Sequence, residues 1–228
     1  MKKVLALASI LMTPCAMFAQ DATAASSASD EYGLLGSRYV SVTALYEHVS
    51  TDYGTYKYSG AGISYSNNVF DDGKDGLDLR ISAADWRNES NRSVYHQNFF
   101  SLGASATCFR RMDYGTTYLS AGASYGHNNY DFKGEYSGIE GYGNDSGDVV
   151  LEAGFEYNVC KQTYLTPFVG YDYGFYDEGT SDGDFYAGLE ALYWITYNYG
   201  VKLNGEYVFE DNDADVFVSS LSFIYRFE

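Results

Sequence analysis

The sequence predicts an all-β fold, a single closed antiparallel barrel of about ten strands. Runs of alternating apolar and polar residues, with turn residues between them, support this prediction. The composition supports it too, because Tyr (25), Phe (14) and Gly (24) are abundant and Pro is rare (2). Aromatic residues favour strands, and Gly marks turns and close backbone approaches. The chain of 228 residues shows no shift in composition that would separate a second domain.

The first residues predict export. Lys2 and Lys3 precede an apolar run at 4–11, which is the pattern of a cleaved signal peptide. We expect cleavage after residue 19, or as late as residue 24. Residues 20–36, rich in Ala, Ser and Asp, are interpreted as a flexible lead-in, and residues 37–228 as the barrel.

Ten runs fit the strand pattern. In the clearest, 149–159, Leu151 and Phe155 share one face, whereas Glu152 and Glu156 share the other. The expected strands are 38–48, 56–67, 77–86, 97–109, 116–127, 149–159, 164–176, 185–195, 199–209 and 217–227. Eight or twelve strands stay open as alternatives, because boundaries read from a sequence are imprecise.

The connections between these runs favour a membrane barrel over a soluble sandwich. Those at 112–115, 161–162 and 196–197 are tight, whereas 128–147 is long and polar. All tight turns fall at one end, as in transmembrane barrels with short periplasmic turns and longer outer loops. The connection at 68–76 falls at the same end but is not tight, which is a departure from the pattern.

Aromatic residues near the strand ends also favour a membrane. On the apolar face they are Tyr46, Tyr65, Tyr125, Tyr157, Tyr173, Tyr193, Tyr207, Phe217 and Tyr225. Amphipathic rings prefer the boundary between lipid and water, so these residues predict two girdles. The alternative is the ordinary preference of Tyr for strands.

The last strand alternates apolar residues up to a terminal aromatic. The residues concerned are Phe217, Leu221, Phe223, Tyr225 and Phe227. This run resembles the final strand of bacterial outer-membrane barrels, which their assembly machinery recognises, although here Glu228 follows the aromatic. Residues 37–227 as a whole resemble the small outer-membrane barrels of the outer-membrane protein A and opacity-protein group.

The resemblance implies insertion into the outer membrane with exposed loops. The partners it implies are outer-membrane lipid and lipopolysaccharide, the assembly machinery and periplasmic chaperones. We expect a monomer. Nucleic acid is excluded as a partner, because a chain of net charge −17 lacks the excess of Lys and Arg that phosphate binding needs.

The polar strand faces predict a charged lumen. Its network is expected to comprise Arg80, Glu152, Glu156, Asp172, Glu190, Lys202, Glu206 and Arg226. Charges in a narrow interior must pair or form hydrogen bonds. We expect a structural plug, because side chains nearly fill so small a barrel. The alternative is a small channel that prefers cations, since acids exceed bases.

We therefore expect a non-enzymatic protein that serves envelope integrity or surface contact through acidic outer loops, without catalytic residues, cofactor or metal. An outer-membrane hydrolase is the remaining alternative. His48, His96 and His127 lie near outer strand ends and invite comparison with outer-membrane proteases and lipid A deacylases, but three residues match too little. Residues 211–215 alternate carboxylates but lack the Gly and Glu of a calcium loop.

Overall fold

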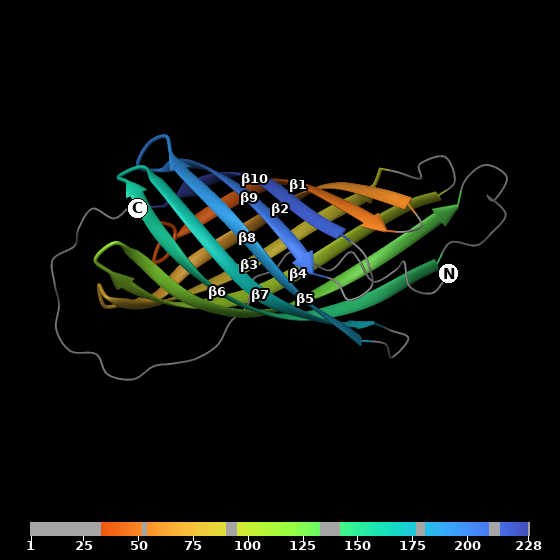
Figure 1. The fold of residues 1–228 in the computed structure, drawn as a ribbon, viewed down its shortest axis with the longest axis horizontal. Coiled ribbons are helices and arrows are strands. Elements are labelled where there is room, and N and C mark those ends of the chain that lie inside the picture. The colour runs from red at the N-terminus through yellow and green to blue at the C-terminus, as the bar shows by residue number, and fades with distance from the viewer. Residues whose placement is uncertain are drawn as a thin grey trace.

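The computed structural model describes residues 33–51, 54–89, 95–132, 142–176, 181–209 and 215–227. The expected signal peptide, most of the lead-in and most of the 211–215 run lie outside these residues. Within the described ranges, ten antiparallel strands form one closed barrel (Figure 1). The predicted fold is confirmed, and the alternatives of eight or twelve strands are excluded.

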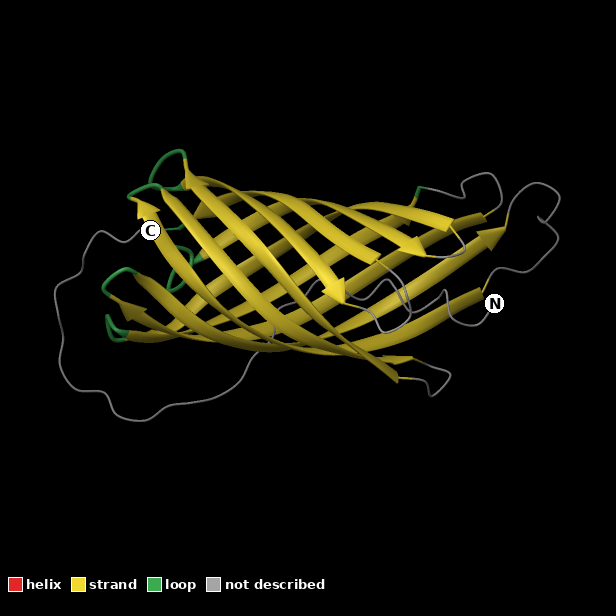
Figure 2. Ribbon diagram, viewed as in Figure 1, coloured by secondary structure: helices red, strands yellow, loops and turns green. Residues whose placement is uncertain are grey.

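The strands are long, and they follow one another around the barrel in chain order. They are β1 (Tyr39–Thr51), β2 (Gly54–Asp71), β3 (Asp75–Asn88), β4 (Tyr95–Met112), β5 (Gly115–Phe132), β6 (Tyr142–Cys160), β7 (Thr163–Tyr176), β8 (Ser181–Trp194), β9 (Tyr199–Phe209) and β10 (Asp215–Arg226). Strand β1 closes the barrel on β10, with Tyr39 opposite Arg226 and Ser50 opposite Asp215. Figure 2 shows the strands wound around a common axis. No helix in the described ranges is long and apolar enough to cross a membrane.

The turns that end β2, β4, β6 and β8 lie together at one end of the barrel, here called the short-turn end. The expected departure at 68–76 is wrong, because β2 continues to Asp71 and β3 begins at Asp75. Gly73, at φ 88°, makes this reversal possible, since a left-handed conformation costs glycine little. The Gly73 N–H donates to Asp71 Oδ1 at 2.8 Å.

The opposite end, here called the loop end, also differs from expectation. The predicted loop at 128–147 is partly strand, since β5 runs to Phe132 and β6 begins at Tyr142. Their backbones remain paired, with Tyr130 opposite Tyr142. The apolar alternation ends before these strands do, because pairing of the backbones needs no apolar side chains.

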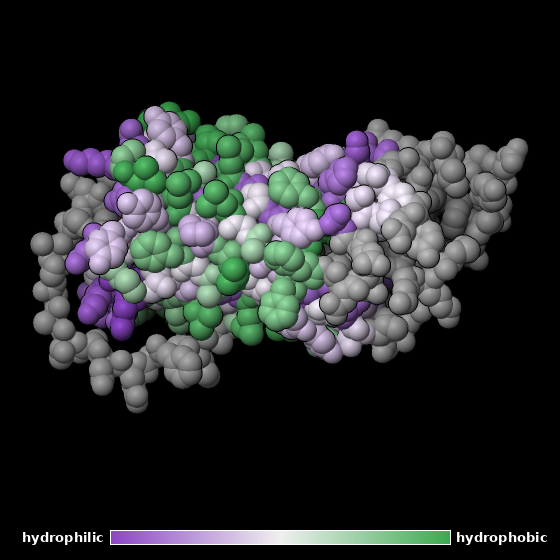
Figure 3. All heavy atoms as spheres, in the orientation of Figure 1, coloured by the Kyte–Doolittle hydropathy of each residue, from purple (hydrophilic) through white to green (hydrophobic). Residues whose placement is uncertain are grey.

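The outer face of the barrel is apolar and the inner face is polar. Leu151 is 51% exposed on the outside, whereas its neighbour Glu152 is buried inside. The residues expected in the aromatic girdles are exposed as well, among them Tyr125, Tyr157 and Tyr193. Figure 3 shows apolar side chains gathered around the middle of the barrel. A water-soluble barrel would have the opposite arrangement.

Replacing Leu151 with Arg tests the apolar belt. Leu151 lies on the outer face between Val149 and Ala153, in the middle of β6. We expect Leu151→Arg to lower the free energy of unfolding by about 2–4 kcal/mol, the cost of Arg facing lipid at the bilayer midplane. Reversible denaturant unfolding in lipid vesicles measures it.

Asn129→Arg is the control, because Asn129 is exposed near the loop end of β5. Asn129→Arg should lower the free energy of unfolding by at most about 1 kcal/mol, the cost of Arg at a position near the membrane interface. Equal losses for the two variants would contradict a lipid-facing belt.

Candidate functional site in the lumen

The lumen is built in layers along the barrel axis. A large apolar cluster towards the loop end, the upper apolar layer, contains Leu45, Val49, Tyr58, Ala84, Trp86, Phe99, Val150, Phe168, Tyr186, Val208, Val216 and Val218. A smaller cluster at the short-turn end, the lower apolar layer, contains Leu34, Tyr39, Tyr164, Leu192, Trp194 and Ile224. Polar side chains fill the space between them.

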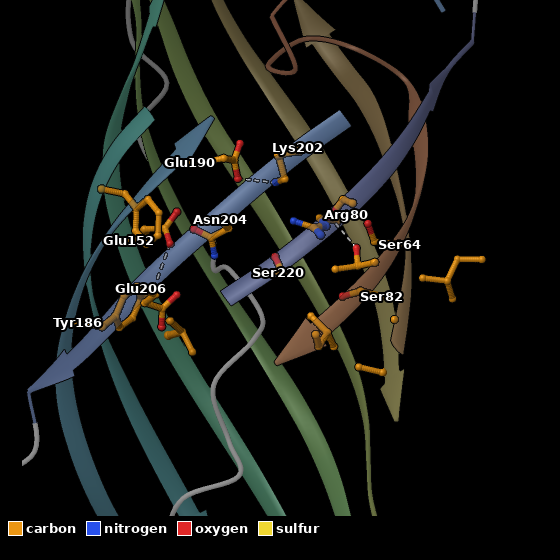
Figure 4. Close-up of a pocket in the computed structure, with 18 of the residues that line it drawn as sticks. Ser64, Arg80, Ser82, Glu152, Tyr186, Glu190, Lys202, Asn204, Glu206 and Ser220 are labelled. Atoms are coloured by element: carbon orange, nitrogen blue, oxygen red, sulfur yellow. Dashed lines mark hydrogen bonds and ion pairs between the residues drawn. The ribbon is translucent and has the colours of Figure 1, made fainter. Parts of the chain in front are cut away.

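The polar space contains a chamber, drawn in Figure 4. Its main cavity has a volume of ≈ 110 Å³, and a second cavity of ≈ 90 Å³ lies towards the lower layer. Both are lined by Arg80, Tyr118, Glu152, Glu190 and Lys202, so we treat them as one chamber. A water needs about 10–15 Å³ of such volume, so several waters fit inside.

Lys202 and Glu190 form an ion pair across neighbouring strands β9 and β8. Their side chains are 14% and 19% exposed, so the pair is largely desolvated. Losing one partner would leave the other charge buried and uncompensated.

Neutral donors hold a second carboxylate of the chamber. The hydroxyl of Tyr118 donates to Glu152 Oε1 at 2.8 Å, and that of Tyr186 donates to Glu152 Oε2 at 3.2 Å. Each ring lies against a glycine of the adjacent strand, Gly154 for Tyr118 and Gly170 for Tyr186. A Cβ at either position would overlap the ring, so these glycines let the hydroxyls reach Glu152.

The structure brings together six of the eight residues expected in the lumen network. Arg80, Glu152, Asp172, Glu190, Lys202 and Glu206 line the main cavity. Among the described side chains of these six residues, Lys202 and Glu190 form an ion pair. Figure 4 places Arg80 beside Ser64 and Ser82, and away from Glu152 and Glu206.

The other two expected network residues lie lower, at the short-turn end. Arg226 lies over the Trp194 ring, 4.0 Å from its centroid, and over the Tyr197 ring at 4.6 Å. Its guanidinium also donates to the Tyr197 carbonyl at 2.7 Å. Glu156 accepts a hydrogen bond from the Leu34 N–H at 3.1 Å. Both residues therefore hold backbone groups at the mouth of the barrel.

Residues 33–36, the last part of the expected flexible lead-in, lie inside the barrel mouth. Leu34 is only 6% exposed and belongs to the lower apolar layer. The Gly36 N–H donates to Asp78 Oδ2 at 2.8 Å. One buried leucine and paired backbone groups hold this segment, although its composition resembles that of a linker.

Sequence reasoning missed several buried acids of the lumen. Asp78 and Asp148 face inwards and are about as buried as Glu156. Asp148 accepts a hydrogen bond from the Ser124 hydroxyl at 2.8 Å, and Asp78 accepts one from the Asn68 amide at 2.8 Å. Both lie on the polar face of an alternating run, and that signal could have identified them.

Ion pairs stabilise the rim at the short-turn end. Arg110 donates to Asp75 through Nε at 2.6 Å and Nη2 at 2.8 Å, and Arg111 pairs with Asp71 at 2.7 Å. The hydrogen bond from Arg110 holds the pKa of Asp75 below its usual value. This forked geometry favours the ionised carboxylate.

The histidines considered for catalysis do not converge in the lumen. His127 lies on the outer face of β5, where its Nδ1 is 2.7 Å from Asp145 Oδ1, and both side chains are about half exposed. His48 faces outwards from β1, and the side chain of His96 lies outside the described residues. The parts of the chain that the structure describes contain no group of three His, Cys, Asp or Glu side chains that could hold a metal.

The residues expected to form the assembly signature all lie on the outer face. Phe217, Leu221, Phe223, Tyr225 and Phe227 are each more than one-third exposed. Tyr225 contacts Phe227 and Tyr199 edge-on or tilted, with centroids 5.2 Å apart in both pairs. They form an apolar ridge along the strand that closes the barrel.

Solved structures share this architecture. The β domain of the Bordetella autotransporter BrkA matches with a TM-score of 0.57 and 12% identity, over 84% of this chain and 100% of that one. The transport unit of the Escherichia coli autotransporter AIDA-I matches with a TM-score of 0.55 and 10% identity, over 84% of this chain and 90% of that one. The translocator domain of NalP from Neisseria meningitidis matches with a TM-score of 0.52 and 10% identity, over 86% of this chain and 90% of that one.

The chain folds as an outer-membrane β-barrel. At such low identity the matches show the fold alone. No family model matches the sequence, and no curated protein does.

Breaking the Lys202–Glu190 pair tests the chamber. We expect Lys202→Met to lower the free energy of unfolding by about 3–5 kcal/mol, because it leaves a buried carboxylate without its partner. The double variant Lys202→Met/Glu190→Gln should recover most of that loss. Denaturant unfolding in detergent micelles at pH 8 measures the free energy of unfolding of the unaltered protein and of each variant.

Arg87→Gln provides the control, because the Arg87–Asp85 pair is 67% and 50% exposed. Loss of this exposed pair should lower the free energy of unfolding by at most about 1 kcal/mol. A double variant that is no more stable than Lys202→Met alone would contradict the buried pair.

Proposed function

We propose that this chain is a non-enzymatic protein of the bacterial outer membrane, exported through a cleaved signal peptide. Its barrel is closed to solutes, and its outer loops serve envelope integrity or surface contact. The observation that carries this proposal is the layered lumen. The upper and lower apolar layers lie on either side of the polar chamber.

Side chains from opposite walls form the upper layer. Val216 and Val218 of β10 are fully buried, and they belong to the same cluster as Trp86 of β3 and Phe168 of β7. An ion passing this layer would lose its hydration shell without gaining polar ligands, which is costly. The layer therefore supports a plugged barrel over an open pore.

The alternative of a cation-preferring channel draws support from the chamber. Four acids and two bases line its main cavity. The acids are Glu152, Asp172, Glu190 and Glu206, and the bases are Arg80 and Lys202. Rings of acid favour cations in channels. The apolar layers argue against conduction, and we keep the plugged barrel as the proposal.

The proposed role of the loops follows from where they lie. Five connections fall at the loop end, and those at 177–180 and 210–214 are acidic in sequence. In barrels of this class the longer connections face the cell exterior.

The proposed partners remain outer-membrane lipid and lipopolysaccharide, and the proposed state is a monomer. The assembly machinery and periplasmic chaperones are the proposed partners during insertion.

Cell fractionation with a gel-shift measurement tests the membrane location. We expect the protein in the outer-membrane fraction, and we expect its gel mobility to change on boiling, because a closed strand ladder resists detergent until heated. Recovery as a compact monomer in buffer without detergent would contradict the proposal.

Planar-bilayer recording tests closure. We expect the purified, folded barrel to give no conductance steps above background, because both apolar layers exclude hydrated ions. Ser219→Ala, on the outer face of β10, is the control, because it should behave like the unaltered protein after the same purification and folding. Reproducible cation-selective steps from the unaltered protein would favour the channel instead.

A further inference from the structure

Residues 33–37 form a compact turn in the mouth of the barrel at the short-turn end. The Ser37 N–H donates to the Leu34 carbonyl at 3.1 Å, and the Ser37 hydroxyl donates to the Gly33 carbonyl at 3.0 Å. Figure 1 shows the segment, coloured red-orange before β1, at the end that carries the tight turns. The segment is not part of any strand ladder.

The barrel wall holds this turn at three points. Leu34 packs in the lower apolar layer, and its N–H donates to Glu156. The Gly36 N–H donates to Asp78. Arg226 approaches the Gly33 carbonyl, with Nη1 at 3.5 Å. The three barrel residues come from β6, β3 and β10, so the turn contacts widely separated parts of the wall.

The turn also forms one wall of the polar chamber. Leu34 and Leu35 line the lower cavity together with Arg80, Glu152 and Lys202. Leu35 and Gly33 line a further cavity of ≈ 20 Å³ beside Arg111 and Glu156. Withdrawal of the turn would therefore open the chamber towards the short-turn end, while the upper apolar layer stayed in place.

Withdrawal would leave the barrel itself intact. Only one side chain of the turn, Leu34, is fully buried, and no backbone bond between strands involves residues 33–37. Segments with few buried contacts open at a much lower free energy than the strands around them. Release of the turn would therefore require much less free energy than unfolding of the barrel.

The lining of the lower cavity determines which solutes would enter. It contains four acids, Asp78, Glu152, Glu156 and Glu190, and two bases, Arg80 and Lys202. A desolvated space with surplus carboxylates attracts cations and repels anions.

We propose that residues 33–37 act as a stopper that controls the entry of small cations into the lumen chamber from the short-turn end. The inference goes beyond the proposed plug, because it makes one wall of the plug movable. The barrel stays closed to through-passage and becomes accessible from one side.

The test measures entry with thiol reagents. The reporter is Ser105→Cys, because Ser105 lines the lower cavity, in a full chain whose three native cysteines are replaced by alanine. The probes are two methanethiosulfonates, one carrying trimethylammonium and the other sulfonate. Labelling rates are measured on the folded barrel in detergent, and folding is verified by the boiling-dependent gel shift.

The displacing variant is Gly36→Val. Gly36 has φ +84°, and a Cβ there would overlap the Arg111 guanidinium and lie 2.9 Å from Asp71 Oδ2. The control is Gly73→Val, which introduces the same residue at φ 88° in a turn of the same rim, outside the stopper. Leu34→Ser provides a second displacing variant if Gly36→Val fails to fold.

We expect slow labelling of the reporter alone, and labelling at least about tenfold faster with Gly36→Val or Leu34→Ser, because strain or lost burial shifts the turn outwards. Gly73→Val should leave the rate unchanged, and the trimethylammonium probe should react faster than the sulfonate. Fast labelling without displacement, equal rates in Gly36→Val and Gly73→Val, or preference for the sulfonate would each overturn the proposal.

Discussion

Closure of the sheet between β1 and β10 is the constraint on which the rest of the structure depends. In an apolar medium every backbone N–H and C=O must find a partner within the protein, and a closed ladder is the way strands achieve this. The pairing from Tyr39–Arg226 to Ser50–Asp215 removes both sheet edges. Closure also separates the two faces of each strand, so that alternate side chains face the surroundings or a narrow interior.

Closure explains why the sequence predicts the strands well and the interior poorly. Alternation is a local signal, so the run around Leu151 and Glu152 indicates both the strand and the outer face. Strand ends are less readable, because β5 and β6 continue past the apolar pattern on backbone pairing alone. The burial of Leu34 is invisible in a segment rich in small and polar residues, since it depends on a pocket built by distant strands.

Pairing within the lumen could not be predicted for the same reason. Alternation correctly indicates that Glu152 and Lys202 face inwards, but partners across the lumen depend on the stagger of the closed sheet. Glu152 meets the hydroxyls of Tyr118 and Tyr186 and has no basic partner among the described ion pairs. Those hydroxyls reach Glu152 because Gly154 and Gly170 leave room for the rings. The residues involved lie on four strands, β5 to β8.

The polar chamber has a physical origin that requires no transport. An interior packed only with apolar side chains would be more stable, because the attraction within a buried ion pair seldom exceeds the free energy needed to remove both charges from water. Strands apolar on both faces, however, would resemble membrane-spanning helices during export, because about 20 consecutive apolar residues suffice for that. The inward residues Glu152, Glu190 and Lys202 prevent such runs in β6, β8 and β9. Under the proposed export, the chain would cross one membrane before it enters another, and this route favours a polar lumen between the two apolar layers.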